Sequence, residues 1–290
     1  MKFSFVSLVT KLTLATSVAG ALVGCDDPTY PTPTPVTESS VGQARVLVVN
    51  AAPGSQGVTI QLDNQAFGIV APYLGSAAGT YTSVNAGLRL LLFNDPANIP
   101  ATPAAATAAG VAPLTAPRTL VSRTTYLGGT NYTVFVTDLP TRAYVFPVTT
   151  TSNQGGIQTL PLIDNLAAPA ATFAKIRFVN LAPTATGGNT TYGIFNFLTQ
   201  APLFSAVPTR GYRSTTNTST ATPPVVTNFA NFTEVAAGPY TLDVRSVAAT
   251  PLAGTQQVVT LVAGKIYTLY TRGIAGNANT PLGISVVTHN

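Results

Sequence analysis

The chain has 290 residues, of which 46% are hydrophobic and only 8% charged, and its formal net charge is +5. This hydrophobic content argues against a disordered protein, and the length allows two domains that each have a core. The basic residues are scattered and form no dense face, so we expect no nucleic-acid binding. Frequent Val, Thr, Gly and Pro favour an all-β protein with many turns.

Residues 1–24 have the pattern of a secretory signal peptide, with basic Lys2 and Lys11 and an apolar run over residues 12–23. That run is too short to span a membrane, and no later run approaches the roughly 18 residues that a spanning helix needs. The leader ends in LVGC, which resembles the lipobox of bacterial lipoproteins, where the leader is cut before a Cys that receives a diacylglyceryl group. Cys25, the only cysteine, is therefore the predicted lipidation site and membrane anchor. The alternative is a free thiol behind an ordinary leader.

Residues 25–43 form a predicted stalk between the lipid anchor and the folded part. Alternating Pro and Thr favour an extended polyproline conformation. Asp26 and Asp27 follow Cys25 directly. Acidic residues there resemble an export signal to the outer face of the outer membrane in one large Gram-negative group, and an inner-membrane retention signal in enteric bacteria. We expect the first, a cell-envelope protein on the outer membrane with its domains at the surface. A plain polar spacer is the remaining alternative.

One stretch occurs twice and divides the rest of the chain. Residues 44–53 read ARVLVVNAAP, and residues 174–183 read AKIRFVNLAP. Each is a β-branched run closed by Asn, a small residue and Pro, which is typical of a strand and a turn. Two later pairs of segments also recur, at 81–87 with 232–238 and at 127–134 with 262–269. We therefore predict a first β repeat over residues 44–166 and a second over residues 174–290.

The two repeats differ mainly in two loops, residues 94–118 in the first and residues 198–228 in the second. About seven short strands in each repeat, separated by Gly, Asn and Pro turns, predict a β-sandwich. Each repeat has its own set of strands, so we expect either one to fold alone.

The order of these motifs, with the linking segment LIDNLAAP at residues 162–169, resembles domain-of-unknown-function family 4397, a family of tandem extracytoplasmic bacterial domains. The resemblance covers roughly residues 44–290. It departs from the family pattern at residues 128–131, which read GGTN where the second repeat has AGKI. The resemblance implies immunoglobulin-like β-sandwiches on the cell envelope and carries over no catalytic residue. The predicted fold class is all-β, with two tandem immunoglobulin-like β-sandwich domains.

The sequence offers few groups for catalysis, which needs a titratable side chain near neutrality or paired carboxylates. His289, the only histidine, is the penultimate residue, and we expect a mobile chain end there. Asp243 and Arg245 lie two apart on a predicted strand and share a face, where we expect a solvated ion pair. We predict no catalytic residue, no metal ligand and no cofactor, and hence a protein that is not an enzyme.

A glycan platform often uses exposed aromatic side chains, and this chain has no Trp. Tyr212, flanked by Arg210 and Arg213 in the 198–228 loop, is the best candidate, together with Tyr73 in the first repeat. The alternative for each is an ordinary loop residue. Two functions stay open: adhesion, matrix or structural interaction with a protein partner, and a surface module that binds a glycan or a small ligand.

Overall fold

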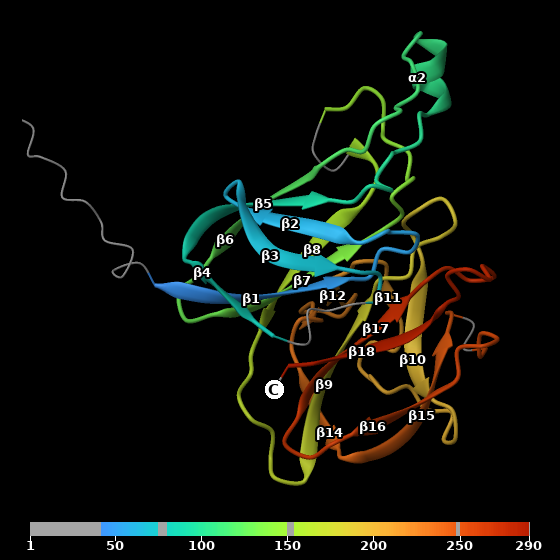
Figure 1. The fold of residues 1–290 in the computed structure, drawn as a ribbon. Coiled ribbons are helices and arrows are strands. Elements are labelled where there is room, and N and C mark those ends of the chain that lie inside the picture. Colours follow the sequence, from blue (N-terminus) through green and yellow to red (C-terminus); the bar gives the residue numbers. More distant parts are fainter. Residues whose placement is uncertain (1–41, 75–79, 150–153, 248–249, 290) are drawn as a thin grey trace, which may run out of the picture. The chain divides into compact units, whose positions relative to one another are not determined.

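The computed structural model describes residues 42–74, 80–149, 154–247 and 250–289, all within one compact unit, Glu38–Asn290. The predicted signal peptide, Cys25 and most of the predicted stalk lie outside the described residues. The predicted all-β fold class is confirmed, because strands make up nearly all of the regular structure (Figure 1). In the described ranges no helix is long and apolar enough to cross a membrane.

The first repeat forms two four-stranded sheets, in the orders β4-β1-β7-β8 and β3-β2-β5-β6. The opening strand β1 pairs antiparallel with β4 and parallel with β7. The short helix α2 (Ala104–Ala108) lies in the predicted 94–118 loop. The strands are β1 (Gln43–Asn50), β2 (Val58–Leu62), β3 (Gln65–Ala71), β4 (Thr82–Asn85), β5 (Gly87–Asn94), β6 (Leu120–Tyr126), β7 (Asn131–Thr137) and β8 (Gln158–Asp164).

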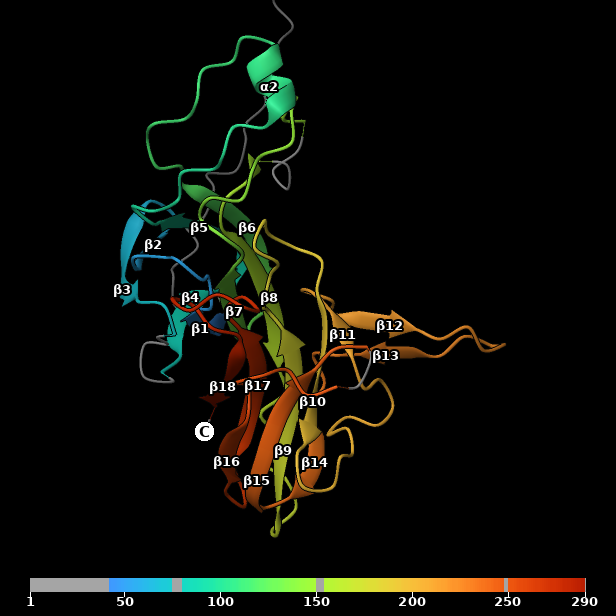
Figure 2. The same ribbon diagram turned by 90° about the vertical axis from the view of Figure 1, so that its right-hand side faces the viewer.

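The second repeat follows the same plan, with sheets β14-β9-β17-β18 and β11-β10-β15-β16. Its opening strand β9 also pairs antiparallel with one neighbour, β14, and parallel with the other, β17. A separate hairpin, β12–β13, is built from the 198–228 loop and projects from the sheets (Figure 2). The strands are β9 (Phe173–Asn180), β10 (Thr191–Asn196), β11 (Arg210–Gly211), β12 (Thr216–Thr218), β13 (Val226–Asn228), β14 (Thr233–Ala236), β15 (Gly238–Arg245), β16 (Gln257–Leu261), β17 (Ile266–Arg272) and β18 (Gly283–Thr288).

Strand β1 is buried on both of its faces. Successive side chains of a strand point to opposite sides of the sheet. Val46 and Val48 face the apolar core between the two sheets of the first repeat. Leu47 and Val49 face the other way and are equally buried, in a cluster that includes residues of the second repeat. The β-branched run that opens the repeat is therefore apolar at consecutive positions because each side of the strand meets a packed layer.

Strand β9 repeats this arrangement in the second repeat. Ile176 and Phe178 face that repeat's own core. Arg177 and Val179 point to the opposite side and are also buried. Strands β1 and β9 are thus buried in the same way, and each repeat has one sheet whose outer face is covered.

We call the layer between these two covered faces the junction. Phe135 on β7 and Tyr270 on β17 meet there, with ring centroids 5.4 Å apart. Burying one large apolar side chain stabilises a fold by about 1.5–3 kcal/mol, so an isolated repeat would leave a costly surface exposed. The expectation that each repeat folds alone stays a prediction. The apolar side of the junction consists of Leu47, Val49, Ala51, Tyr81, Phe135, Leu160 and Leu162 of the first repeat with Val179, Leu181, Tyr270 and Val287 of the second.

Candidate functional site

The polar centre of the junction is the carboxylate of Asp164, the last residue of β8. It accepts hydrogen bonds from the Arg177 Nη2 at 2.5 Å, the Thr133 hydroxyl at 2.7 Å and the Tyr81 hydroxyl at 2.8 Å. The side chains of Asp164 and Arg177 are both completely buried. Burial raises the pKa of Asp164, and the nearby Arg177 charge opposes that rise. The ion pair thus joins the end of the first repeat to the opening strand of the second.

Arg177 has partners for its other nitrogens as well. Its Nε donates to the Thr268 hydroxyl at 2.7 Å, and its Nη1 donates to the carbonyls of Ile163 at 3.0 Å and Ala230 at 3.3 Å. The guanidinium also lies 4.6 Å from the centre of the Phe232 ring. Burial lowers the pKa of Arg177, and the Asp164 charge opposes that effect. A buried charge needs this degree of compensation to be tolerated.

The expectation of a mobile end at His289 is wrong. Its side chain is only 5% exposed. Its Nδ1 lies 2.7 Å from the Tyr81 hydroxyl and its Nε2 lies 2.7 Å from the Thr268 hydroxyl. Burial, with the positive charge of Arg177 nearby, lowers the pKa of His289 to about 3. The imidazole is therefore neutral near pH 7 and connects the two repeats from inside the junction.

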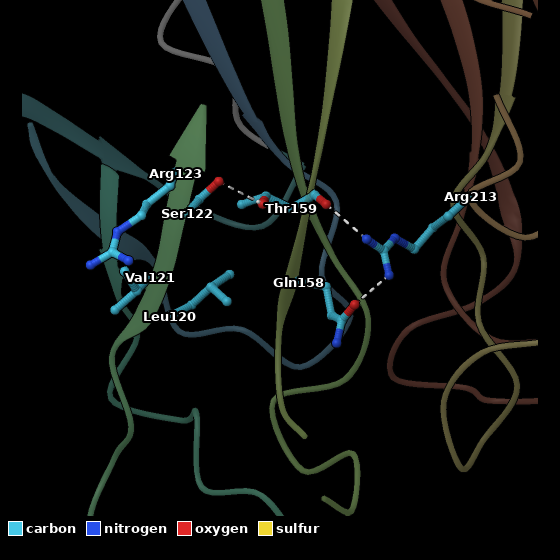
Figure 3. A pocket seen from close by; sticks show the side chains of 7 residues that line it. All are labelled: Leu120, Val121, Ser122, Arg123, Gln158, Thr159 and Arg213. Carbon is cyan, nitrogen blue, oxygen red and sulfur yellow. Dashed lines mark hydrogen bonds between the residues drawn. The ribbon is translucent and has the colours of Figure 1, made fainter. Parts of the chain in front are cut away.

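Tyr212 and Arg213 do not form an exposed platform, contrary to the prediction. Both are half-buried and reach across to the first repeat. The Tyr212 hydroxyl lies 3.1 Å from the Thr137 hydroxyl. Arg213 donates to the Thr159 carbonyl at 2.8 Å and to the Gln158 side-chain oxygen (Figure 3). The two side chains therefore help to attach the 198–228 loop to the first repeat.

A hollow of about 240 Å³ lies beside this attachment (Figure 3). Strand β6 supplies residues 120–123, β8 supplies Gln158 and Thr159, and Arg213 comes from the second repeat. Inside it the Thr159 hydroxyl donates to the Ser122 hydroxyl at 3.1 Å. Several of its polar groups are thus bonded to each other, so we do not favour it as a ligand site.

Tyr73, the candidate from the first repeat, is half-buried and its hydroxyl is buried. Burial raises its pKa, and the positive charge of Arg272 on β17 partly offsets that rise. Tyr73 therefore also lies where the two repeats meet, and it is not an exposed stacking surface.

Arg210 differs from the other three candidates because its side chain contacts residues of the second repeat, Phe178, Phe204 and Phe229, and does not reach across to the first. It is 6% exposed, so the prediction that it belongs to an exposed platform is wrong. Three aromatic rings surround its guanidinium carbon, those of Phe229 at 4.2 Å, Phe204 at 4.6 Å and Phe178 at 5.3 Å. Burial lowers the pKa of Arg210 to about 10, which leaves it charged at neutral pH.

Asp243 and Arg245 do form the predicted ion pair, but the expected solvation is wrong. The two side chains are 1% and 4% exposed and are joined by two hydrogen bonds of 2.9 Å. The Arg245 guanidinium lies 4.8 Å from the centre of the Phe195 ring. The two residues share a face of the strand, as their spacing predicts, and the Phe195 ring covers the ion pair.

The other acidic side chains of the described residues also support local structure. Asp63 accepts from Arg89 and from the Leu90 backbone N–H. Asp95 accepts from two backbone N–H groups, and Asp138 pairs with Arg142 at 2.8 Å. The described part of the chain contains no cluster of three His, Cys, Asp or Glu side chains that could hold a metal ion.

No family model matches the chain, and no curated protein matches it. Among solved structures, the Bacillus anthracis TIE protein is 9% identical with a TM-score of 0.18, and the match covers 81% of this chain and 34% of that one. The chain thus spans about a third of that protein's length. A proposed cell adhesion protein from Parabacteroides distasonis is 11% identical with a TM-score of 0.17, covering 89% of this chain and all of that one. Another from Bacteroides uniformis is 9% identical with a TM-score of 0.19, covering 88% of this chain and all of that one. Such low TM-scores carry no argument about function.

Proposed function

We propose that the chain is a non-enzymatic, lipid-anchored cell-envelope protein whose two β-sandwich repeats act as one rigid arm in adhesion, matrix or structural interaction. The observation that carries this proposal is the buried Asp164–Arg177 pair, which ties the two repeats together with no exposure of either side chain. Rotation of one repeat against the other would separate two fully buried charges, at a cost of several kcal/mol. An arm that must carry load away from a membrane benefits from such a fixed joint.

The use of the titratable groups supports a role without catalysis. A general base needs an accessible proton acceptor whose pKa lies near the working pH. His289 is buried with both ring nitrogens bonded, and Asp164, Asp138 and Asp243 are each paired with an arginine. These groups hold the fold together. Turnover by the purified chain on cell-wall or polysaccharide substrates would overturn this part of the proposal.

The anchor at Cys25 gives the first testable prediction. Cys25→Ser removes the thiol that would carry the lipid, so we expect the variant to leave the membrane fraction and to appear as precursor or soluble protein. Membrane fractionation with intact-mass measurement of the N-terminal peptide checks this. Asp27→Asn, which keeps the thiol and changes one residue after it, is the matched control and should remain lipidated. A Cys25→Ser variant that stays in the membrane at the wild-type level would contradict the proposed anchor.

The location on the outer membrane is tested by protease treatment of intact cells, with a periplasmic protein as the control for leakage. We expect digestion of this chain and protection of the control. Adhesion is then tested by comparing the attachment of cells that carry the wild-type chain with that of cells that carry Cys25→Ser, at equal amounts of folded protein. Loss of attachment in the variant supports the adhesive role, and equal attachment argues against it.

A further inference from the structure

We propose that the second repeat has a binding site for an acidic sugar, in which Arg210 holds the sugar carboxylate. The site is the pocket lined by residues 203–207 and Arg210 on one side and by residues 226–233, which include strand β13 of the hairpin, on the other. This inference does not depend on the adhesive role, because it concerns a pocket within one repeat.

The charge of Arg210 has no counter-charge in the protein. The other buried arginines of the sandwich strands, Arg177 and Arg245, are each paired with an aspartate. Among the described residues no acidic side chain forms an ion pair with Arg210. A buried, uncompensated cation is costly, and a bound anion would remove that cost.

The hydrogen-bonding capacity of Arg210 is also incompletely used. Its Nη1 donates to the Phe178 carbonyl. Its Nε is buried and has no hydrogen-bond partner among the described residues. The three aromatic rings attract the cation and fix its position, but a ring face does not replace an in-plane acceptor for the N–H groups. A carboxylate would supply that acceptor, since it accepts two parallel bonds from a guanidinium.

The pocket that Arg210 lines has a volume of about 380 Å³, which is within the usual range for small-ligand sites. Its lining combines the two kinds of surface that a sugar requires. Hydroxyl and amide groups come from Ser205, Thr227, Asn228, Asn231 and Thr233, and apolar surface comes from Leu203, Phe204 and Val226. This mixture favours a carboxylate on a polyhydroxylated ring over a simple organic anion.

The rim of the pocket adds a further observation. Val226 on the hairpin is 63% exposed and lines the pocket itself. An exposed apolar side chain that lines a pocket provides a surface that the apolar face of a sugar ring can cover. The hairpin thus supplies apolar and polar groups to the lining, and the buried arginine supplies the charge.

The test is calorimetric titration of the detergent-solubilised full chain with sodium glucuronate, glucose and sodium acetate. We expect glucuronate to bind most tightly, acetate to bind at least ten-fold more weakly, and glucose to show no measurable heat. Arg210→Met should lose glucuronate binding by at least ten-fold, and Arg210→Lys should lose less because it keeps the charge but not the fork. Arg89→Met, which removes a half-buried arginine of the first repeat, is the control and should bind like the wild type.

Circular dichroism establishes whether Arg210→Met is folded. If it is not, Asn231→Ala decides the question, since it leaves Arg210 in place and removes one polar group of the pocket; we expect it to weaken glucuronate binding several-fold. Equal binding of glucuronate by the wild type and by a folded Arg210→Met would overturn the assignment of Arg210. Equal binding of acetate and glucuronate would overturn the acidic-sugar class, and absence of glucuronate binding would overturn the site.

Discussion

Arg177→Met is expected to lower the free energy of unfolding by about 3–5 kcal/mol, since it leaves the buried Asp164 carboxylate without its partner charge. The variant also removes the donors that bond Thr268 and the Ile163 carbonyl. Methionine has a comparable length and fills most of the vacated space, so the loss reports mainly on the charge. Urea denaturation followed by circular dichroism measures it.

Two further variants make this result specific. Arg89→Met breaks the Arg89–Asp63 pair, whose side chains are 25% and 42% exposed, and should cost about 1 kcal/mol or less. The double variant Arg177→Met with Asp164→Leu removes both buried charges and should recover much of the stability lost by the single variant. Equal losses for Arg177→Met and Arg89→Met would show that the junction pair contributes no more than a surface pair.

Acidification is expected to destabilise the chain through His289. The pKa of His289 is lowered to about 3 in the fold, against about 6.5 in an unfolded chain. The unfolded state therefore binds a proton first as the pH falls, and the stability contributed by the neutral ring is complete above pH 6.5 and lost as the pH falls towards 3. Between pH 7.5 and pH 5 this amounts to about 2 kcal/mol.

The measurement is the pH dependence of the unfolding free energy for the wild type and for His289→Asn. The raised pKa values of Asp138 and Asp164 act in the opposite direction, because those carboxyls take up protons in the folded state first. They are present in both proteins and cancel in the difference. We expect the wild type to lose about 2 kcal/mol more than His289→Asn over this range. Parallel pH profiles would mean that His289 is solvated.

The sequence predicts the sandwiches well because their signals are local. The recurring strand motif and the Gly, Asn and Pro turns are enough to place β1 and β9 and the turns that follow them. The run at residues 46–49, which is apolar at every position, also carried a signal for the junction, whereas the matching run at residues 176–179 is interrupted by Arg177. Consecutive apolar residues in a strand indicate burial on both faces, whereas a sandwich with one solvated face should alternate.

The sequence also indicates, more weakly, which polar side chains face the junction, because side chains alternate between the two faces of a strand. Leu160, Leu162 and Asp164 lie on one face of β8 and are all buried. Val287 is buried in the junction, and His289 continues its face beyond the end of β18. The residue at each strand end points to the same side as the residue two positions before it. The sequence does not show which residues bond to Asp164 and His289. Arg177 reaches Asp164, and Tyr81 reaches His289, only through the packing of one repeat on the other.

The candidate ligand residues show the same limit. An aromatic residue between two arginines in a long loop is equally consistent with a ligand site and with an attachment between repeats. The structure uses Tyr212 and Arg213 for attachment and buries Arg210 among phenylalanines. Only the three-dimensional arrangement separates these neighbouring arginines into different roles.

The two repeats are expected to form one body through the junction. A protease site inserted between Ala168 and Ala171, in the exposed link between β8 and β9, allows the chain to be cut after folding. We expect the two halves to remain together in size-exclusion chromatography and native mass spectrometry after complete cleavage, and to separate when Arg177→Met is present. Separation of the cleaved wild-type halves under native conditions would mean that the junction does not hold the repeats together.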